Sequence, residues 1–428
     1  MKPSVVITGM GCVTPLGYTP GEIYEAMLQG KTAYSAISLF DASACSCSIG
    51  GEIPNFSIRD LGISGSNMML RYNKLQMKAA YQMLNDYGLL ASLENNAMNC
   101  AVYVANHPVN LDPETLQIIR SICSSGGEGA MDFSRLGDNL HRIPPLSGVK
   151  QLTTVPSHFI AKTTGAHGPG NLYCNSDCGG ITALLSAARA IETGRIDQAM
   201  VSASFSPFSA HEFRWWLETG LVRSTAARGN PEKLVTPFSP QSSGTLMSEG
   251  AGAIFLEREE VALSNGRPIL ARIQGGASLT VPGETYLELS AAGFTKALNL
   301  ALERAKLAPG DIDLMMCNAP SVAAWDDAEL KGISAVWNGS SVSASALKGY
   351  LGYLGPVSGL LDVILAVQSM ISQTAVPLNH TSAPSDSRTK WVRPENAAMD
   401  IERTVVSSAG PGGAYSAIIL EKGDNHPR

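Results

Sequence analysis

Asp177 lies at the kind of position where an enzyme that works through a covalent intermediate presents its nucleophile. The residue pattern predicts a strand over residues 171–176 and a helix from Cys178 to about Thr193, so Asp177 falls on the turn between them. A thiol at a helix start is activated as the anion and would suit thioester exchange. Asp177 offers a carboxylate instead, which the helix dipole stabilises as the anion and which is a poor nucleophile towards a thioester. The type of this one side chain therefore decides between a covalent catalyst and a protein with another task.

Two cysteines near Asp177 in the sequence are alternative nucleophiles. Cys178 is one residue into the predicted helix, where its side chain would point about 100° away from the turn. Cys174 lies within the predicted strand, and neither thiol has a histidine in a position expected to activate it. The simpler interpretation of both cysteines is that they are small buried side chains. The simpler interpretation of Asp177 is that it caps the N-terminus of the helix, which would stabilise the helix by roughly 1 kcal/mol. A role of Asp177 towards a partner protein and direct chemistry at this residue stay open.

Strand-like and helix-like segments alternate along the chain, which predicts an α/β protein. Buried strands are predicted over residues 4–8, 101–105, 198–203, 252–256, 314–318, 403–407 and 416–420. Helices are predicted over residues 21–29, 69–87, 181–193, 290–305, 328–336 and 358–371. In the helix after Asp177, the residues Ile181, Leu184, Leu185, Ala188 and Ile191 share one face, which is typical of a helix packed on a core.

The chain divides near residues 257–270, where a charged run is followed by Ser-Asn-Gly-Arg-Pro. A Gly-rich turn leads into an apolar strand before this seam, at residues 249–257, and again near the end of the chain, at residues 410–421. The repetition indicates an internal duplication, with halves over residues 1–262 and 263–428. Residues near 109–150 carry mixed signals and are expected to form an excursion from the first half.

The composition favours a cytoplasmic protein and excludes several function classes. With 428 residues, of which 44% are hydrophobic, the chain can bury a large core, and the low charged content of 16% leaves surface for a partner. The net charge of −6 argues against nucleic acid and anionic membranes, and no run of about 18 apolar residues predicts a membrane span. The 8 cysteines lack the spacing of a metal site and are expected to be reduced thiols.

Motifs in five regions of the chain point to one family. They are VVITGMGCVTPLG at residues 5–17, the segment 168–194 around Asp177, TPF at 236–238 with SEGAGAIFLE at 248–257, Lys348 with Gly352, and GPGG at 410–413. In this order, and over nearly the whole chain, they resemble the β-ketoacyl synthase family, which condenses acyl thioesters. The resemblance implies the thiolase-like fold of the α/β class, in which two duplicated halves form a five-layered α-β-α-β-α core.

The catalytic positions of that family are changed in this chain. Active members use a Cys nucleophile and two His residues, whereas the corresponding positions here are Asp177, Pro320 and Tyr353. The loop that would carry the first His is shortened, and SPQSSG at residues 239–244 replaces a turn that contains Arg and Asp. Lys348 and Glu329 match positions that form a buried ionic link behind the active site. The resemblance therefore implies that no residue of this chain is catalytic and that the ionic link is structural.

These changes are similar to those of the chain-length-factor (KS-beta) subunit of type II polyketide synthases. That resemblance implies a non-catalytic subunit that forms a heterodimer with an active ketosynthase and shapes the tunnel for a growing polyketide chain. It implies no metal and no cofactor, with the phosphopantetheine arm of an acyl carrier protein as the substrate carrier. The subfamily usually has Gln at the position of Asp177, so this residue departs from that pattern too.

The resemblance also assigns the dimer contact and the floor of the tunnel. Family members pair through the strand before the nucleophile position, which here comprises Asn171, Leu172, Tyr173, Cys174, Asn175 and Ser176. The residues that form the floor correspond to Leu111, Glu114 and Ile118, whose spacing puts them on one helical face. Core packing of Leu111 and Ile118, with Glu114 in solvent, explains the same spacing equally well.

Two alternatives stay open on the sequence alone. One is a stand-alone acyltransferase or malonyl-carrier decarboxylase of the same fold that uses Cys178 or Asp177. An ionised Asp177 about 4 Å from a malonyl carboxylate would cost on the order of 4 kcal/mol at an effective dielectric near 20. Decarboxylation is therefore disfavoured unless Asp177 is protonated. The other alternative is a homodimeric binding protein without a tunnel.

Overall fold

A mixed β-sheet runs through the whole molecule, and the computed structural model describes it over residues 3–90, 93, 97–107, 112–125, 129–225, 234–379, 383–384 and 388–424. The sheet has 11 strands in the order β11-β10-β9-β12-β13-β8-β1-β7-β6-β4-β5. Strands β1 (Val5–Val13), β6 (Gln198–Phe205) and β7 (Gly250–Arg258) are buried along nearly their whole length. Because both faces of these strands are buried, their sequences are continuous runs of apolar and small residues.

The sheet consists of two halves with the same topology. In the first half β1 pairs antiparallel with β7 and β7 with β6, while β4 (Cys100–Ala105) pairs parallel with β6 and with the edge strand β5 (Gly170–Tyr173). The second half repeats this order with β8 (Ala271–Thr280), β13 (Ala414–Lys422), β12 (Arg403–Gly410), β9 (Leu314–Met316) and β10 (Val342–Ser345), and β11 (Thr389–Trp391) extends it. The halves join where β1 pairs with β8 at Val6–Arg272 and Ile7–Ala271.

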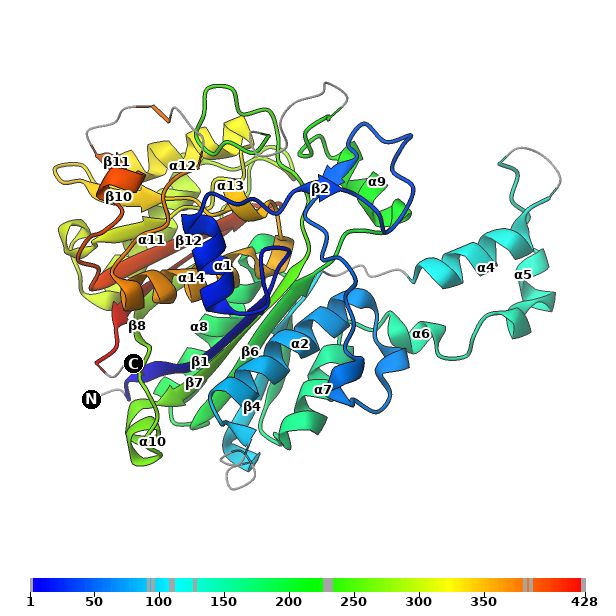
Figure 1. Ribbon diagram of the computed structural model, residues 1–428, viewed down its shortest axis with the longest axis horizontal. Coiled ribbons are helices and arrows are strands. Elements are labelled where there is room, and N and C mark those ends of the chain that lie inside the picture. The colour runs from blue at the N-terminus through cyan, green and yellow to red at the C-terminus, as the bar shows by residue number, and fades with distance from the viewer. Residues whose placement is uncertain are drawn as a thin grey trace.

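Helices form three layers around the two halves of the sheet (Figure 1). Helices α8 (Gly179–Glu192) and α14 (Ser358–Ser372) pack against each other and against strands of both halves. Helices α2 (Arg71–Asp86) and α7 (Val155–Thr164) cover the outer face of the first half, and α11 (Ala291–Ala305) with α12 (Ala323–Val336) cover that of the second. The layers follow the order α-β-α-β-α, so the predicted fold class is confirmed.

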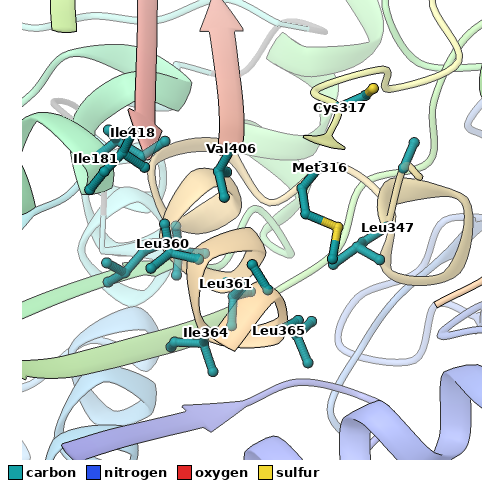
Figure 2. Packing of buried hydrophobic residues seen from close by; sticks show 14 of the residues in the cluster. Ile181, Met316, Cys317, Leu347, Leu360, Leu361, Ile364, Leu365, Val406 and Ile418 are labelled. Atoms are coloured by element: carbon teal, nitrogen blue, oxygen red, sulfur yellow. The ribbon is translucent and has the colours of Figure 1, made fainter. Parts of the chain in front are cut away.

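The two central helices approach each other closely because a glycine on each of them, Gly180 and Gly359, faces a larger side chain on the other. A Cβ atom on Gly180 of α8 would lie 2.9 Å from Cβ of Leu360 and 2.9 Å from the Pro356 carbonyl oxygen. Figure 2 shows Leu360 of α14 beside Ile181 and Ile418, so residues from three elements meet at this contact. The segment Gly355–Ser372 is long and apolar enough to cross a membrane, but it is 83% buried within the protein and is therefore a core helix.

A helical arm projects from the first half at the place where the excursion was predicted (Figure 1). It carries α4 (Pro113–Cys123), α5 (Arg135–Asp138) and α6 (Ser147–Lys150). The remaining elements are short and lie around the core: α1 (Pro20–Leu28), α9 (Ala210–Glu218), α10 (Glu259–Ser264), α13 (Lys348–Leu351) and the strand pair β2 (Ser35–Ala36) and β3 (Ile49–Gly50). We refer to residues 112–154 as the arm, apart from 126–128, which lie outside the described residues.

The predicted strands and helices are found with shifted ends, and five of the described strands were missed: β2, β3, β8, β10 and β11. Strand β8 is only partly buried and contains Arg272, Gln274 and paired glycines, so it lacks the apolar run by which the other strands were predicted. The short strands β10 and β11 also went unpredicted. The strand expected over residues 171–176 ends at Tyr173, and the helix expected from Cys178 begins at Gly179.

Candidate functional site

Asp177 lies in a tight turn at the centre of the molecule. It belongs to a single 3-10 turn, Ser176–Cys178, that links β5 to α8. Ser176 has a φ of 45°, which is unusual for a residue with a side chain and stores strain at this point of the chain. Strand β12 passes so close that a Cβ atom on Gly410 would lie 2.9 Å from Cγ of Asp177. The backbone thus has the sharp turn that presents a catalytic side chain, and Asp177 is at its apex.

The carboxyl group of Asp177 is bonded to Tyr353. Its side chain is only 1% exposed, and its Oδ1 accepts a hydrogen bond of 2.5 Å from the Tyr353 hydroxyl. The other oxygen, Oδ2, is buried without a hydrogen bond of ordinary geometry. Burial raises the pKa of Asp177 to about 7, although the bond from Tyr353 and the positive charge of Lys348 act to lower it. The carboxyl group therefore exchanges its proton near neutral pH instead of being a fixed anion.

The expected N-cap role of Asp177 is wrong. Helix α8 starts after Cys178, which stands at the cap position, and no side chain caps the helix there. Asp177 turns its carboxyl group to Tyr353, and only its main-chain oxygen is held locally, by a hydrogen bond of 3.1 Å from the Ser408 hydroxyl. The long-range partner prevails because it satisfies a polar group that burial would leave unpaired.

Aromatic rings fill the space around Tyr353. The Tyr353 ring lies edge-on to Trp216 at 5.2 Å and to Phe205 at 6.4 Å between centroids. Trp216 is buried, whereas its neighbour Trp215 is 48% exposed and lies edge-on to it. The ring of His107 packs against Phe205 and both tryptophans. We call these rings the aromatic plug, and they separate Asp177 from solvent on this side.

The loop that contains Pro320 is held by backbone bonds and has no group suited to acid–base chemistry. Pro320 is buried, and Ser321 after it has a φ of 70°. Asp326 accepts hydrogen bonds from the backbone nitrogens of Ser321 at 3.2 Å and of Phe238 at 2.8 Å. Asp326 therefore connects this shortened loop to the segment after Thr236. The sequence analysis did not predict this structural role of Asp326.

Lys348 pairs with Asp362, so the expected link to Glu329 is not a direct one. The Lys348 ammonium lies 3.5 Å from Asp362 Oδ2 and donates a hydrogen bond of 3.1 Å to Asn318 Oδ1. Glu329 instead accepts from the backbone nitrogens of Asn318 and Ala319, each at 2.8 Å, and from Ser407. Asp362 is the one charged residue in the apolar sequence of α14, and that isolation was the signal that it would need a buried partner.

Buried carboxyl groups outnumber the cation at this site. Burial raises the pKa of Asp326 to about 8, and it also raises the pKa of Glu329 and of Asp362. The charge of Lys348 lowers the pKa of each of these groups, but one cation cannot hold all of them ionised. In the described part of the chain no three His, Cys, Asp or Glu side chains are arranged to hold a metal ion.

The cysteines near Asp177 are not activated. Cys178 is fully buried, its Sγ donates to the Ser408 carbonyl at 3.3 Å, and burial raises the pKa of its thiol to about 12. Cys174 is exposed one residue beyond the end of β5, and partial burial raises the pKa of this thiol as well. An activated nucleophile needs a lowered pKa, so neither thiol matches that requirement.

Two of the three residues assigned to the tunnel floor, Glu114 and Ile118, lie on the arm. Leu111 is outside the described residues. Glu114 is on α4 with its side chain 68% exposed and 3.7 Å from the Lys150 ammonium, and Ile118 on the same helix is half-buried. Glu114 therefore faces solvent in the single chain, as the simpler interpretation had it.

The residues assigned to the dimer contact lie at the edge of the sheet. Asn171, Leu172 and Tyr173 belong to β5, which is the last strand of the sheet and is exposed or half-buried along its length. The last residue of the assigned segment, Ser176, is in the turn before α8.

Comparison with protein families identifies the class to which this fold and site belong. Residues 2–262 match the beta-ketoacyl synthase N-terminal domain, and residues 270–382 match the beta-ketoacyl synthase C-terminal domain. The chain belongs to the β-ketoacyl synthase family.

Its relatives include proteins named as a synthase, as a polyketide synthase subunit and as a decarboxylase. The chain is 26% identical to 3-oxoacyl-[acyl-carrier-protein] synthase 2 of Coxiella burnetii, covering 98% of this chain and 99% of that protein. It is 25% identical to the tetracenomycin polyketide synthase ketoacyl synthase beta subunit of Streptomyces glaucescens, covering 98% of each. It is 23% identical to the polyketide biosynthesis malonyl-ACP decarboxylase PksF of Bacillus subtilis, covering 98% of this chain and 96% of that one.

Solved structures share the fold over the full length. The ishigamide ketosynthase/chain length factor superposes with a TM-score of 0.84 at 18% identity, covering 99% of this chain and 100% of that one. A type II PKS acyl-carrier protein in complex with its ketosynthase bound to the hexaketide (AntDE:AntF) gives a TM-score of 0.85 at 20% identity, with the same coverage. At these identities the likeness establishes the thiolase-like fold.

The buried Asp177 carboxyl group predicts a pH-dependent stability that Asp177→Asn removes. Because the pKa rises from 3.8 unfolded to about 7 folded, the folded state holds a proton that the unfolded state releases between these values. The stabilising contribution is complete below about pH 4 and is lost as the pH rises through about 7. We expect the free energy of unfolding of the wild type, relative to Asp177→Asn, to fall by about 2–3 kcal/mol between pH 5 and pH 8.

Urea unfolding of both purified proteins at several pH values measures this difference. Asp86→Asn is the matched control, because Asp86 is exposed at the end of α2 and the substitution is chemically the same. A wild-type-to-Asp177→Asn difference that stays constant from pH 5 to pH 8 would contradict the assignment of a buried, neutral carboxyl group.

Thiol labelling of the native protein is expected to modify Cys174 and to spare Cys178. Cys174 is exposed, whereas Cys178 is fully buried with a thiol pKa of about 12. Iodoacetamide treatment followed by peptide mass spectrometry locates the modified residue, and Cys174→Ser shows whether any fast-reacting thiol remains. Labelling of Cys178 faster than a free thiol would mean that it is an activated nucleophile.

Proposed function

We propose that this chain is the non-catalytic chain-length-factor subunit of a type II polyketide synthase. It pairs with an active ketosynthase and shapes the tunnel into which the growing polyketide extends. The observation that carries the proposal is the hydrogen bond between Asp177 and Tyr353, which occupies two of the three positions where an active member has its nucleophile and its histidines. A carboxyl group sealed by a tyrosine can neither form a thioester nor stabilise an enolate.

The third position supports the same conclusion. Pro320 has no donor on either its side chain or its backbone nitrogen, so it cannot stabilise developing negative charge. The surrounding loop is tied to Asp326 instead of being open towards a substrate. Loss of all three groups leaves the fold intact, which suits a subunit whose task is structural.

The edge strand β5 supports pairing with another subunit. As the last strand of the sheet it has backbone groups available for a further strand, and such an edge is a liability unless a partner covers it. A catalytic ketosynthase subunit of the same fold offers an equivalent edge. Pairing across a two-fold or pseudo-two-fold axis would extend the sheet through both subunits.

The arm supports a large contact with that partner. Among the described residues, six of the exposed large hydrophobic side chains lie on the arm: Met131, Phe133, Leu140, Leu146, Val149 and Leu152. A cluster of this kind on a projecting segment marks a protein–protein contact. Because α4 lies on the arm and not in the body, a tunnel floor on α4 would be formed only between two subunits.

The partners and the substrate carrier follow from the same proposal. The acyl carrier protein would deliver malonyl and polyketide groups on its phosphopantetheine arm to the catalytic partner, and this chain would use no cofactor of its own. The tetracenomycin ketoacyl synthase beta subunit is a relative of this kind at 25% identity. Relatives named as condensing synthases match as well, so the proposal depends on the altered site and not on overall similarity.

The alternative function is decarboxylation of a malonyl carrier by the chain alone. Two observations favour it: the relative PksF is a malonyl-ACP decarboxylase, and burial keeps Asp177 largely neutral below about pH 7, which removes the repulsion of a malonyl carboxylate. The position of Asp177 opposes it, because the residue is 1% exposed and sits behind Tyr353 and the aromatic plug.

Activity is expected only when this chain is co-expressed with a catalytic ketosynthase subunit. Mass spectrometry of products from a malonyl-loaded acyl carrier protein compares this chain alone, the ketosynthase alone and the pair. The pair carrying Asp177→Ala should retain its products within a few-fold, because the partner supplies the nucleophile. Formation of acetyl-carrier protein by this chain alone, and its loss in Asp177→Asn, would establish the decarboxylase alternative and overturn the proposal.

Shortening Ile118 is expected to lengthen the polyketide products of the pair. Ile118 is half-buried on α4, and Ile118→Ala would deepen a tunnel that ends against this helix. Leu111→Ala should act in the same direction, and the product distribution by mass spectrometry is the measurement. Leu263→Ala is the control, because it removes the same kind of side chain from α10, where Leu263 is exposed. Unchanged chain lengths in both Ile118→Ala and Leu111→Ala would remove these residues from the tunnel floor.

A further inference from the structure

An arginine-rich groove lies beside the edge strand β5. It has a volume of about 550 Å³ and is lined on one side by Tyr103, Asn171 and Tyr173 of the two outermost strands. Its other side carries Arg189, Arg195 and Arg304, and no acidic residue lines it in the described part of the chain. We call this surface the arginine groove. It stands out on a chain whose net charge is −6.

The three guanidinium groups differ in how they are held, and only the charge of Arg189 is paired with a carboxylate. Arg189 is 61% exposed and pairs at 3.1 Å with Glu192, which belongs to an adjoining groove. Arg304 donates a hydrogen bond of 2.7 Å to the Gly276 carbonyl, which fixes its position without neutralising it. Within the described residues, neither Arg195 nor Arg304 has a carboxylate at ion-pair distance. The groove therefore keeps a positive charge of about two.

The position of the arginine groove couples its charge to pairing through β5. A second chain that adds to β5 also covers Asn171 and Tyr173, which line the groove. If that second chain were another copy of this protein, the two-fold contact would bring two copies of the arginine groove, one from each chain, into the same interface. Like charges that approach across an interface oppose association, and unlike charges favour it.

We propose that the arginine groove selects the partner at the β5 edge: it opposes pairing of two copies of this chain and favours a subunit whose own edge strand is flanked by carboxylates. The inference rests on the proposed function in one respect, namely that the natural partner is a ketosynthase subunit. The groove adds a reason for heterodimer formation over homodimer formation. Salt weakens this selection, because the charges are exposed.

Mixing two forms of this chain tests the groove without reference to the natural partner. The double variant Arg189→Glu/Arg195→Glu reverses the charge and leaves Arg304 with its structural bond. We expect neither the wild type nor the variant alone to dimerise at low salt, whereas the equimolar mixture associates at least tenfold more tightly in sedimentation experiments. Protection of Cys174 from alkylation in the mixture shows that association occurs at the β5 edge, because Cys174 follows this strand.

A matched double variant controls for total charge. Arg214→Glu/Lys331→Glu makes the same change of net charge at two exposed positions, on α9 and α12, away from the groove. This variant mixed with the wild type should associate no more than the wild type alone. Equal association in the two mixtures, or strong dimerisation of the wild type alone, would overturn the inference.

Binding to the co-expressed ketosynthase subunit separates this inference from the proposed function. We expect the Arg189→Glu/Arg195→Glu variant to bind that subunit at least tenfold more weakly at low salt, and the control variant to bind within about twofold of the wild type. Binding that the groove variant leaves unchanged would refute the groove and leave the heterodimer standing. Failure of the wild type to bind the subunit at all would refute the proposed function, and the mixing experiment would still decide the groove.

Discussion

The burial of Lys348 among carboxyl groups is the constraint on which the rest of the site depends. One ammonium lies in ion-pair contact with Asp362 and within electrostatic reach of Asp177, Asp326 and Glu329. All of these carboxyl groups have a raised pKa because burial disfavours their charged forms. The centre of the molecule approaches neutrality by protonation as well as by pairing. In this balanced site Asp326 and Glu329 accept hydrogen bonds from the backbone of the surrounding loops and hold them in place.

The backbone around Asp177 has the shape of a catalytic turn although the chemistry is missing. Ser176 has a positive φ, and Gly410 provides the close approach of β12. The positive φ belongs to the main chain of the turn, and the glycine on β12 leaves room for the side chains of Ser176 and Asp177. The side chains of Asp177, at the apex, and Tyr353 fill the space between them and form a hydrogen bond with each other. The packing of α8 preserves the sharp turn, and the aromatic plug covers the side chain at its apex.

The fold class and the turn that carries Asp177 could be predicted from the sequence because both are encoded locally. Apolar runs mark the strands, and Asp177 falls on a turn between a strand and a helix. The partners of the buried groups could not be predicted. Tyr353 lies 176 positions from Asp177, and the bond forms only once the central helices have packed. Lys348 was assigned to Glu329, but which of several buried carboxyl groups comes within 3.5 Å depends on the packing of α14.

With Asp177 and Tyr353 buried, the features of this chain that another protein can contact lie at its surface. The β5 edge offers unpaired backbone groups, the arm offers apolar side chains, and the arginine groove lies beside that edge strand. Backbone pairing and apolar burial supply affinity but discriminate poorly between chains of the same fold, since every such chain has an edge strand. Charged side chains beside the edge strand do discriminate between partners, because the sign of the charge can differ from one partner to another. The arginine groove is therefore the feature best suited to decide which edge strand pairs with β5.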